Sequence, residues 1–225
     1  ALPEQSFLVM GAGVTGRAVT EAIVGHGLAV VVADDRPDEL IRAMCDRLDV
    51  ELLEHPDIDE LDRRMRAVEA WLPAPGLPDH HPAVAASRRA GIPMLSEFDL
   101  AAAWDGRPVV AVTGTNGKTT VTTLIAEMLE ASAVPAALAG NTDVPLVAAI
   151  GDERPSVFVV EASSFRLGHC RHFAPDVAAW LNFAPDHLDV HGSLSAYEAA
   201  KARIWRDQRR EQIAVANADD EVVMA

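Results

Sequence analysis

A glycine-rich segment, Thr113 to Thr120, constrains this chain more than any other part of its sequence. It follows a run of Val and Ala residues typical of a buried strand and precedes an apolar-striped helix. In such a loop, backbone N–H groups bind phosphates, a lysine reaches the terminal phosphate oxygens and a hydroxyl contacts Mg²⁺. The usual GxxxxGK[ST] spacing would require glycine in place of Val112, so the strict pattern is missed. Strand, GKTT and helix in one run nevertheless favour a phosphate-binding loop over a purely structural one.

A second glycine-rich loop lies near the N-terminus, where Gly11 to Gly16 has the GxGxxG pattern between an expected strand and an expected helix. Asp34 and Asp35 stand at the end of the next expected strand, where folds of this kind bind a ribose. The pattern predicts a nucleotide-diphosphate site, with NAD as the default ligand by analogy. The alternative is a glycine turn that serves only the packing of helix on sheet.

Short runs of Val, Ile and Ala alternate with longer amphipathic segments, which indicates βαβ units around parallel sheets. The expected strands are Phe7 to Met10, Ala29 to Ala33, Val109 to Val112, Val157 to Val160, Val177 to Leu181 and Gln212 to Ala216. The expected helices are Gly16 to Gly25, Pro82 to Ala90, Ser96 to Trp104, Lys118 to Ala131 and Ser195 to Gln208. Ser195 and Glu198 are expected to form a capping box, and Glu54 to Glu69 a solvated helix.

The fold class is therefore α/β, in two domains. Residues 1–106 are expected to form a Rossmann-like parallel-sheet domain, and residues 107–225 a P-loop ATPase-type α/β domain that is truncated. The helix-breaking segment Asp105 to Pro108 marks the boundary. Because the last expected strand leaves the second sheet partly uncovered, the sequence is interpreted as a fragment of a longer protein.

The charge of the chain limits its partners. With 19 Lys and Arg against 34 Asp and Glu, the formal net charge is −15, which disfavours binding to nucleic acid or to an anionic membrane. A phosphate-bearing ligand must then be held by backbone amides and a few placed cations. Two widely separated cysteines, Cys45 and Cys170, suggest a reducing cytoplasm, and no apolar run is long enough to span a bilayer.

The two glycine loops together with three further segments resemble the Mur ligase family. These segments are Glu161 to Phe165, Asp186 to Asp189, and Tyr197 to Lys201. The resemblance covers essentially the whole chain. It is strongest to the members that add D-glutamate to UDP-N-acetylmuramoyl-L-alanine, because Asn116 stands where the L-alanine-adding members typically have His.

The resemblance implies that the first glycine loop binds a UDP-sugar instead of NAD. Val14 and Thr15 would contact the diphosphate, and Asp34, Asp35 and Arg36 would surround the uridine. Pro75-Gly76 resembles a turn that lies against the nucleotide, with Ala74 in place of the usual Ser. Asn141 and Ser163 would approach the substrate, although Thr142-Asp143 departs from the usual pair after the Asn.

In the second domain, the resemblance implies a site for ATP and two Mg²⁺ ions, which Mn²⁺ could replace. The phosphate-binding residues would be Gly114, Thr115, Asn116, Gly117, Lys118, Thr119 and Thr120. Metal ligands would be Thr119, Glu161, His187 and Lys201, the last as a carbamate formed with CO₂. Lys118, His187 and Lys201 would be catalytic. A carbamate suits this role because it replaces a cation with anionic oxygen donors.

The implied reaction is amide bond formation through an acyl phosphate, by a cytoplasmic monomer that acts on small molecules. Alternatives remain: a family member that adds another amino acid, a NAD(P)-binding oxidoreductase, or a non-catalytic UDP-sugar binding protein. A zinc site at Gly168 to His172 with His187 and His191 is conceivable, but its spacing fits no standard zinc pattern. A surface turn is expected there instead.

Overall fold

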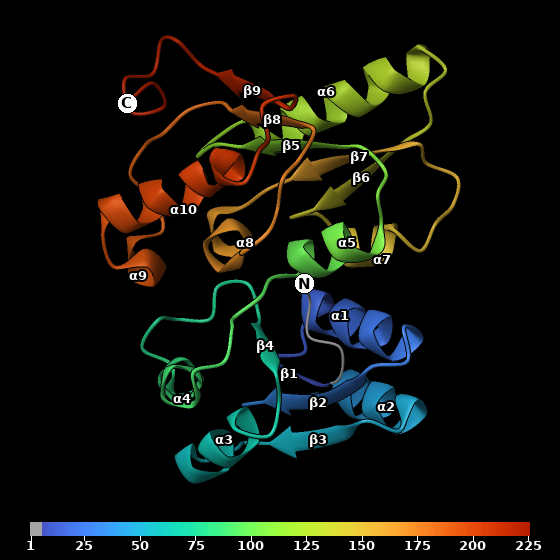
Figure 1. The fold of residues 1–225 in the computed structure, drawn as a ribbon, viewed down its shortest axis with the longest axis vertical. Coiled ribbons are helices and arrows are strands. Elements are labelled where there is room, and N and C mark those ends of the chain that lie inside the picture. Colours follow the sequence, from blue (N-terminus) through green and yellow to red (C-terminus); the bar gives the residue numbers. More distant parts are fainter. Residues whose placement is uncertain (1–5) are drawn as a thin grey trace.

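Two parallel sheets form the frame of the computed structural model, which describes residues 6–225 (Figure 1). The first sheet has the strand order β3-β2-β1-β4. Its strands are β1 (Ser6–Met10), β2 (Ala29–Asp34), β3 (Glu51–Glu54) and β4 (Ala70–Pro73). The helices of this lobe are α1 (Val14–Gly25), α2 (Glu39–Leu48), α3 (Ile58–Met65) and α4 (Pro82–Ala90). Residues Phe7 to Met10 of β1 are all buried, because helices cover both faces of a parallel sheet.

The second sheet has the order β6-β7-β5-β8-β9. Its strands are β5 (Val109–Thr113), β6 (Ala136–Gly140), β7 (Val157–Glu161), β8 (Val177–Trp180) and β9 (Ile213–Ala216). The second lobe consists of this sheet and the remaining helices, which are α5 (Glu97–Trp104), α6 (Lys118–Ala131), α7 (Leu146–Ala149), α8 (Ser164–His169), α9 (Leu188–His191) and α10 (Leu194–Arg206). Every strand pair that the structure describes in residues 6–225 is parallel, which confirms the predicted α/β class.

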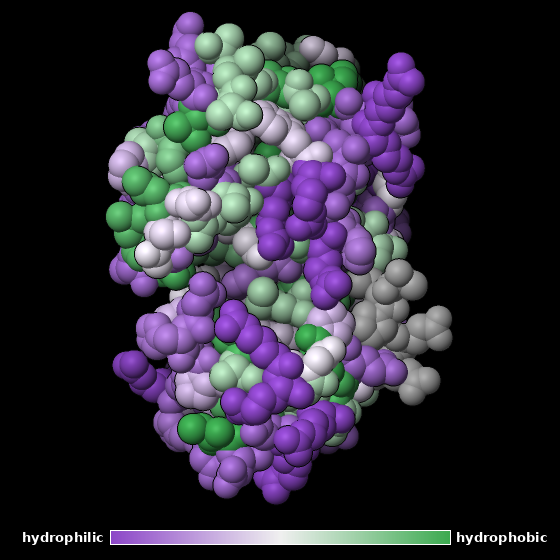
Figure 2. All heavy atoms as spheres, turned by 60° about the vertical axis from the view of Figure 1, so that its left-hand side comes forward, coloured by the Kyte–Doolittle hydropathy of each residue, from purple (hydrophilic) through white to green (hydrophobic). Residues whose placement is uncertain are grey.

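The lobes meet at a waist, where Figure 2 shows polar and apolar side chains mixed over one face. Helix α5 packs beside α7 of the second lobe (Figure 1). Phe7 of β1, Phe98 of α5 and Phe158 of β7 belong to one apolar cluster. A single core therefore runs from the first sheet through α5 into the second, and the division at residue 106 stays a prediction.

All six expected strands and all five expected helices are present, with ends that differ by two residues or fewer. Two local predictions are wrong. The segment 54–69 is not one helix, since Glu54 ends β3 and only Ile58–Met65 is helical. The predicted capping box at Ser195 is absent, because α10 starts earlier and Ser193 caps it by accepting a hydrogen bond from the Ala196 N–H.

None of the helices in the described residues is both long and apolar enough to cross a membrane.

Among the glycines of the first lobe, Gly16 in the turn that starts α1 has the least space for a side chain. A Cβ placed on Gly16 would lie 2.1 Å from the Gly11 carbonyl oxygen, so the last glycine of the GxGxxG pattern lets helix and strand approach each other. Gly25, at the exposed end of the same helix, has no atom within 4 Å of such a Cβ.

We expect Gly16→Ala to lower the free energy of unfolding by about 1–3 kcal/mol, because the added methyl has no room. Gly25→Ala is the matched control and should leave stability unchanged or raise it by about 0.5 kcal/mol. Urea unfolding followed by circular dichroism measures both. Equal stability of the two variants would contradict the packing role of Gly16.

Candidate active site

The phosphate loop joins the carboxyl end of β5 to the first turn of α6. Gly117 adopts a left-handed conformation, with φ of 82°, at the N-cap position of α6. The loop is held from β8, since the Asn182 side chain accepts from the Asn116 N–H at 3.0 Å and donates to the Asn116 carbonyl at 3.1 Å. The helix therefore starts with its free N–H groups at the loop, which is the arrangement that binds phosphate.

Two lysines converge on one oxygen of this loop. Lys118 Nζ donates to the Gly114 carbonyl at 3.0 Å, and Lys201 Nζ, from α10, donates to the same carbonyl at 2.7 Å. They are the only lysines in the sequence. The structure thus brings together two of the three residues predicted to be catalytic, although 82 residues separate them in the chain.

Lys201 is almost completely buried, with 1% of its surface exposed. Its Nζ lies 4.7 Å from the centre of the Tyr197 ring. Burial, together with the positive charge of Lys118, lowers the pKa of Lys201 from 10.5 to about 7. A substantial fraction of this amine is therefore neutral and nucleophilic near neutral pH.

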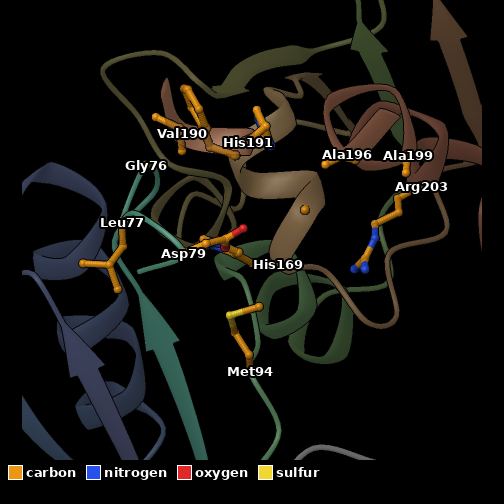
Figure 3. A pocket seen from close by; sticks show the side chains of 13 residues that line it. Gly76, Leu77, Asp79, Met94, His169, Val190, His191, Ala196, Ala199 and Arg203 are labelled. Atoms are coloured by element: carbon orange, nitrogen blue, oxygen red, sulfur yellow. The ribbon is translucent and has the colours of Figure 1, made fainter. Parts of the chain in front are cut away.

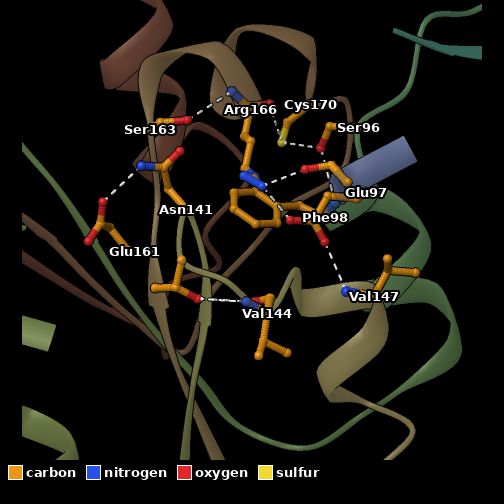
Figure 4. Close-up of polar contacts among 12 residues, drawn as sticks. Ser96, Glu97, Phe98, Asn141, Val144, Val147, Glu161, Ser163, Arg166 and Cys170 are labelled. Carbon is orange, nitrogen blue, oxygen red and sulfur yellow. Dashed lines mark hydrogen bonds and ion pairs between the residues drawn. The ribbon is translucent and has the colours of Figure 1, made fainter. Parts of the chain in front are cut away.

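Glu161, the last residue of β7, faces the start of α6. Thr119 Oγ1 donates to Glu161 Oε2 at 2.6 Å. Asn141 Nδ2 donates to Glu161 Oε1 at 3.0 Å, as Figure 4 shows. The hydroxyl of Thr119 and the carboxylate of Glu161 are hard oxygen donors, so together they fit Mg²⁺ bound beside nucleotide phosphates. Asn141, expected to approach the substrate, here orients the Glu161 carboxylate. Ser163 caps α8 by accepting from the Arg166 N–H.

His187 sits on the loop before α9 in a left-handed conformation, with φ of 51°. Its ring lies 4.8 Å from the Phe165 ring and 6.1 Å from the Tyr197 ring. Asp186 Oδ2 is 3.5 Å from its Nε2. Tyr197 of α10 contacts both this ring and Lys201, so His187 and Lys201 lie near each other around the Tyr197 ring.

In the first lobe, the side chain of Asp34 holds the glycine loop together. Its Oδ2 accepts from the Ala12 N–H at 2.8 Å, and its Oδ1 accepts from the Arg36 N–H at 2.8 Å. Asp35 pairs with the ring of His81 at 2.9 Å. Because His81 Nδ1 accepts from the Ala83 N–H, its Nε2 carries the proton and donates to Asp35. Of these predicted uridine contacts, Asp34 thus acts on the loop itself.

A cavity of about 280 Å³ lies between the lobes (Figure 3). Gly76, Leu77 and Asp79 border it from the first lobe, and His169, His191 and Arg203 border it from the second. Burial lowers the pKa of His169 to about 4, so this imidazole is neutral at pH 7. The Pro75-Gly76 turn predicted to lie against the nucleotide thus faces a space between the lobes.

The surface turn expected at Gly168 to His172 is wrong for the first three residues, because Gly168 and His169 end helix α8 and Cys170 is buried, whereas Arg171 and His172 form an exposed bend. Within residues 6–225, no group of three or more His, Cys, Asp or Glu side chains is placed to hold a metal ion. The zinc alternative is therefore unsupported. Cys45 and Cys170 are both buried and unpaired.

Several functional contacts were missed in the sequence. Asn182 was not singled out, although it follows an expected strand at the same edge of the sheet as the phosphate loop, which is the signal that could have found it. His81 stands just before Pro82 at an expected helix start, where an N-cap residue belongs. Tyr197 was named only as part of the segment Tyr197 to Lys201 and was given no role of its own, yet its Oη lies 3.3 Å from Thr115 Oγ1.

A family model described as the Mur ligase middle domain matches residues 112–225. Two curated relatives are named UDP-N-acetylmuramoylalanine–D-glutamate ligase. That of Desulfotalea psychrophila is 39% identical and aligns with 96% of this chain and 47% of the relative. That of Pelotomaculum thermopropionicum is 40% identical, over 96% of this chain and 48% of the relative. The chain spans about half the length of these curated relatives.

Solved structures share the fold. The UDP-N-acetylmuramate:L-alanyl-gamma-D-glutamyl-meso-diaminopimelate ligase from Neisseria meningitides superposes with a TM-score of 0.61 at 18% identity, over 99% of this chain and 74% of that one. The UDP-N-acetylmuramate-alanine ligase from Thermotoga maritima gives 0.54 at 21% identity, over 97% of this chain and 50% of that one. At these identities the likeness shows the fold alone.

The lowered pKa of Lys201 makes stability depend on pH. Between pH 7 and pH 10 the unfolded chain binds more protons at this lysine than the folded chain, so stability rises with pH in that window. We expect the free energy of unfolding of the wild type to rise relative to Lys201→Met as pH is raised from about 7 to about 9. Urea titrations in CO₂-free buffers measure it, with the exposed Arg154→Met as control. If the difference in the free energy of unfolding between the wild type and Lys201→Met does not change with pH, the lowered pKa of Lys201 is refuted.

Proposed function

This chain belongs to the Mur ligase family, and on that premise we propose that it forms the UDP-substrate lobe and the phosphate-loop lobe of an ATP-dependent ligase. The reaction proposed is the addition of D-glutamate to UDP-N-acetylmuramoyl-L-alanine, a step in peptidoglycan precursor synthesis. The names and identities of the curated relatives support this choice. We further propose a monomer in the reducing cytoplasm, which suits its two unpaired cysteines.

The observation that carries the proposal is the convergence of Lys118 and Lys201 on the Gly114 carbonyl, beside the Thr119–Glu161 pair. The cation of Lys118 at a phosphate loop stabilises the charge of a phosphoryl group in transfer. In the proposed first step, an oxygen of the alanyl carboxylate attacks the γ-phosphorus, and ADP leaves. The amine of D-glutamate then attacks the acyl carbon and loses a proton, and phosphate is expelled.

We propose Thr119 and Glu161 as the residues that hold one Mg²⁺ or Mn²⁺, with His187 and carbamylated Lys201 at a second. When bound, such an ion supplies a Lewis acid for the phosphoryl oxygens. The neutral amine of Lys201 can add CO₂ with loss of one proton, which yields an anionic carbamate. Its remaining N–H can keep the bond to the Gly114 carbonyl.

For the first lobe we propose the diphosphate at Val14 and Thr15, the uridine beside Asp35 and Arg36, and the sugar near Gly76, Asn141 and Ser163. Asp35 is oriented for this role by His81. The net charge of −15 is compatible with an anionic substrate because the start of α1 offers backbone N–H groups. The oxidoreductase alternative leaves Lys118, Glu161 and Lys201 without a role.

We expect Lys118→Ala, made in the full-length enzyme, to lower kcat for D-glutamate-dependent phosphate release by about a hundredfold or more, because a cation at the transferred phosphoryl is lost. The affinity for UDP-N-acetylmuramoyl-L-alanine, measured by calorimetry without ATP, should be unchanged. Arg154→Ala, at an exposed ion pair far from the loop in sequence, is the control. Wild-type turnover by Lys118→Ala would disprove the role of the loop.

A further inference from the structure

A buried ion pair lies where the lobes meet. Arg166 Nε of α8 is 3.2 Å from Glu97 Oε1 of α5, and their side chains are 5% and 1% exposed (Figure 4). Glu97 Oε2 also accepts from the Val147 N–H of α7 at 2.9 Å. The pair therefore joins three helices of the second lobe at fixed geometry.

The same arginine reaches the first lobe. Arg166 Nη2 donates to Thr15 Oγ1 at 2.8 Å, across 151 positions of sequence. Thr15 belongs to the first glycine loop and to the first turn of α1. One guanidinium thus holds the start of α1 against α8 and α5.

The buried ion pair between Glu97 and Arg166 contributes little to the net free energy of folding. Burial raises the pKa of Glu97 and lowers the pKa of Arg166, both against the charged forms. Apolar residues of similar volume in place of a buried ion pair are often neutral or stabilising. The planar guanidinium instead fixes the orientation of Glu97 and Thr15 relative to each other, because its donors point along fixed axes to both side chains.

Arg166 is also close in sequence to the proposed metal site. Glu161, which bonds with Thr119 of the phosphate loop, precedes it by five residues, and Ser163 between them caps α8. Hydrogen bonds and a short stretch of chain therefore connect Thr15, through Arg166 and the first turn of α8, to Glu161 and Thr119.

One donor of the guanidinium remains available. Nη1 of Arg166 is buried and has no hydrogen-bond partner among residues 6–225. Arg166 borders a cavity of about 10 Å³ together with Thr15, Gly16 and Pro75, which has room for roughly one water molecule.

We propose that Arg166 is a positioning residue that fixes the first glycine loop relative to the phosphate loop. A substrate whose diphosphate is held at the first loop then presents its reacting carboxylate to the γ-phosphate at the second. This inference rests on the proposed function. Alignment of the carboxylate with the γ-phosphate has a large effect on the reaction rate, since a displacement of reacting groups by about 1 Å can lower the rate on the order of a hundredfold.

The test uses the full-length enzyme and the double variant Glu97→Gln/Arg166→Gln, which removes both charges and leaves no buried charge unpaired. We expect kcat at saturating substrates to fall about tenfold or more, while the Kd for UDP alone, which contacts only the first lobe, changes by less than about twofold. Amide hydrogen exchange at residues 14–19 should be about tenfold faster, because α1 loses its anchor.

The matched control is Asp62→Asn/Arg89→Gln, which removes an ion pair between α3 and α4 within the first lobe. It should leave kcat and the exchange at residues 14–19 as in the wild type. Unchanged kcat or unchanged exchange in the Glu97/Arg166 variant would overturn the positioning role. If the wild type itself forms no amide bond, the proposed function fails, and the exchange data, which need no activity, still decide whether Arg166 anchors the first glycine loop.

Discussion

Positive charge concentrated at the phosphate loop is the constraint on which the rest of this structure depends. The chain carries a net charge of −15, yet both of its lysines donate to the Gly114 carbonyl oxygen. Burial and the charge of Lys118 disfavour a second ammonium group on the same acceptor, so the pKa of Lys201 falls to about 7 and part of its amine is neutral. The buried position of Lys201 on α10, the hydrogen bonds from Asn182 to the loop and the left-handed Gly117 hold the two amines and the loop in place.

Both lobes provide positive potential for an anionic ligand in a similar way. In each, a parallel strand ends in a glycine loop that starts a helix, so backbone N–H groups supply positive potential at the loop. Acidic residues at these edges then act on the loops themselves: Asp34 binds the first loop, and Glu161 binds Thr119 of the second. The Thr15–Arg166–Glu97 contacts join the two edges, and the core that passes through α5 supports them.

The fold could be read from the sequence where periodicity and glycine placement were strong, as at β1, β5, α4 and α6. The short strand β3 and the six-residue helix α8 gave weaker patterns, because a few residues of mixed polarity fit strand, turn or helix equally well. The Ala-rich strand β6 and helix α2 were missed, although the apolar residues of α2 recur at helical spacing. Site residues near a glycine loop were predicted from spacing. Contacts such as Asn182 with Asn116, His81 with Asp35 and Arg166 with Thr15 were not, since each joins segments that only the tertiary fold brings together. The start of α10 was misplaced by the competition of two serines, Ser193 and Ser195, for one cap.

We propose that the two glycine loops bind two different phosphate ligands, with a UDP-sugar at the first. The most direct test is a pair of calorimetric titrations of this chain, one with UDP-N-acetylmuramoyl-L-alanine and one with NADH, because the GxGxxG pattern alone suits either ligand. We expect saturable binding of the UDP-sugar and none of NADH. Saturable binding of NADH without binding of the UDP-sugar would contradict it and would return the first lobe to a dinucleotide-binding function.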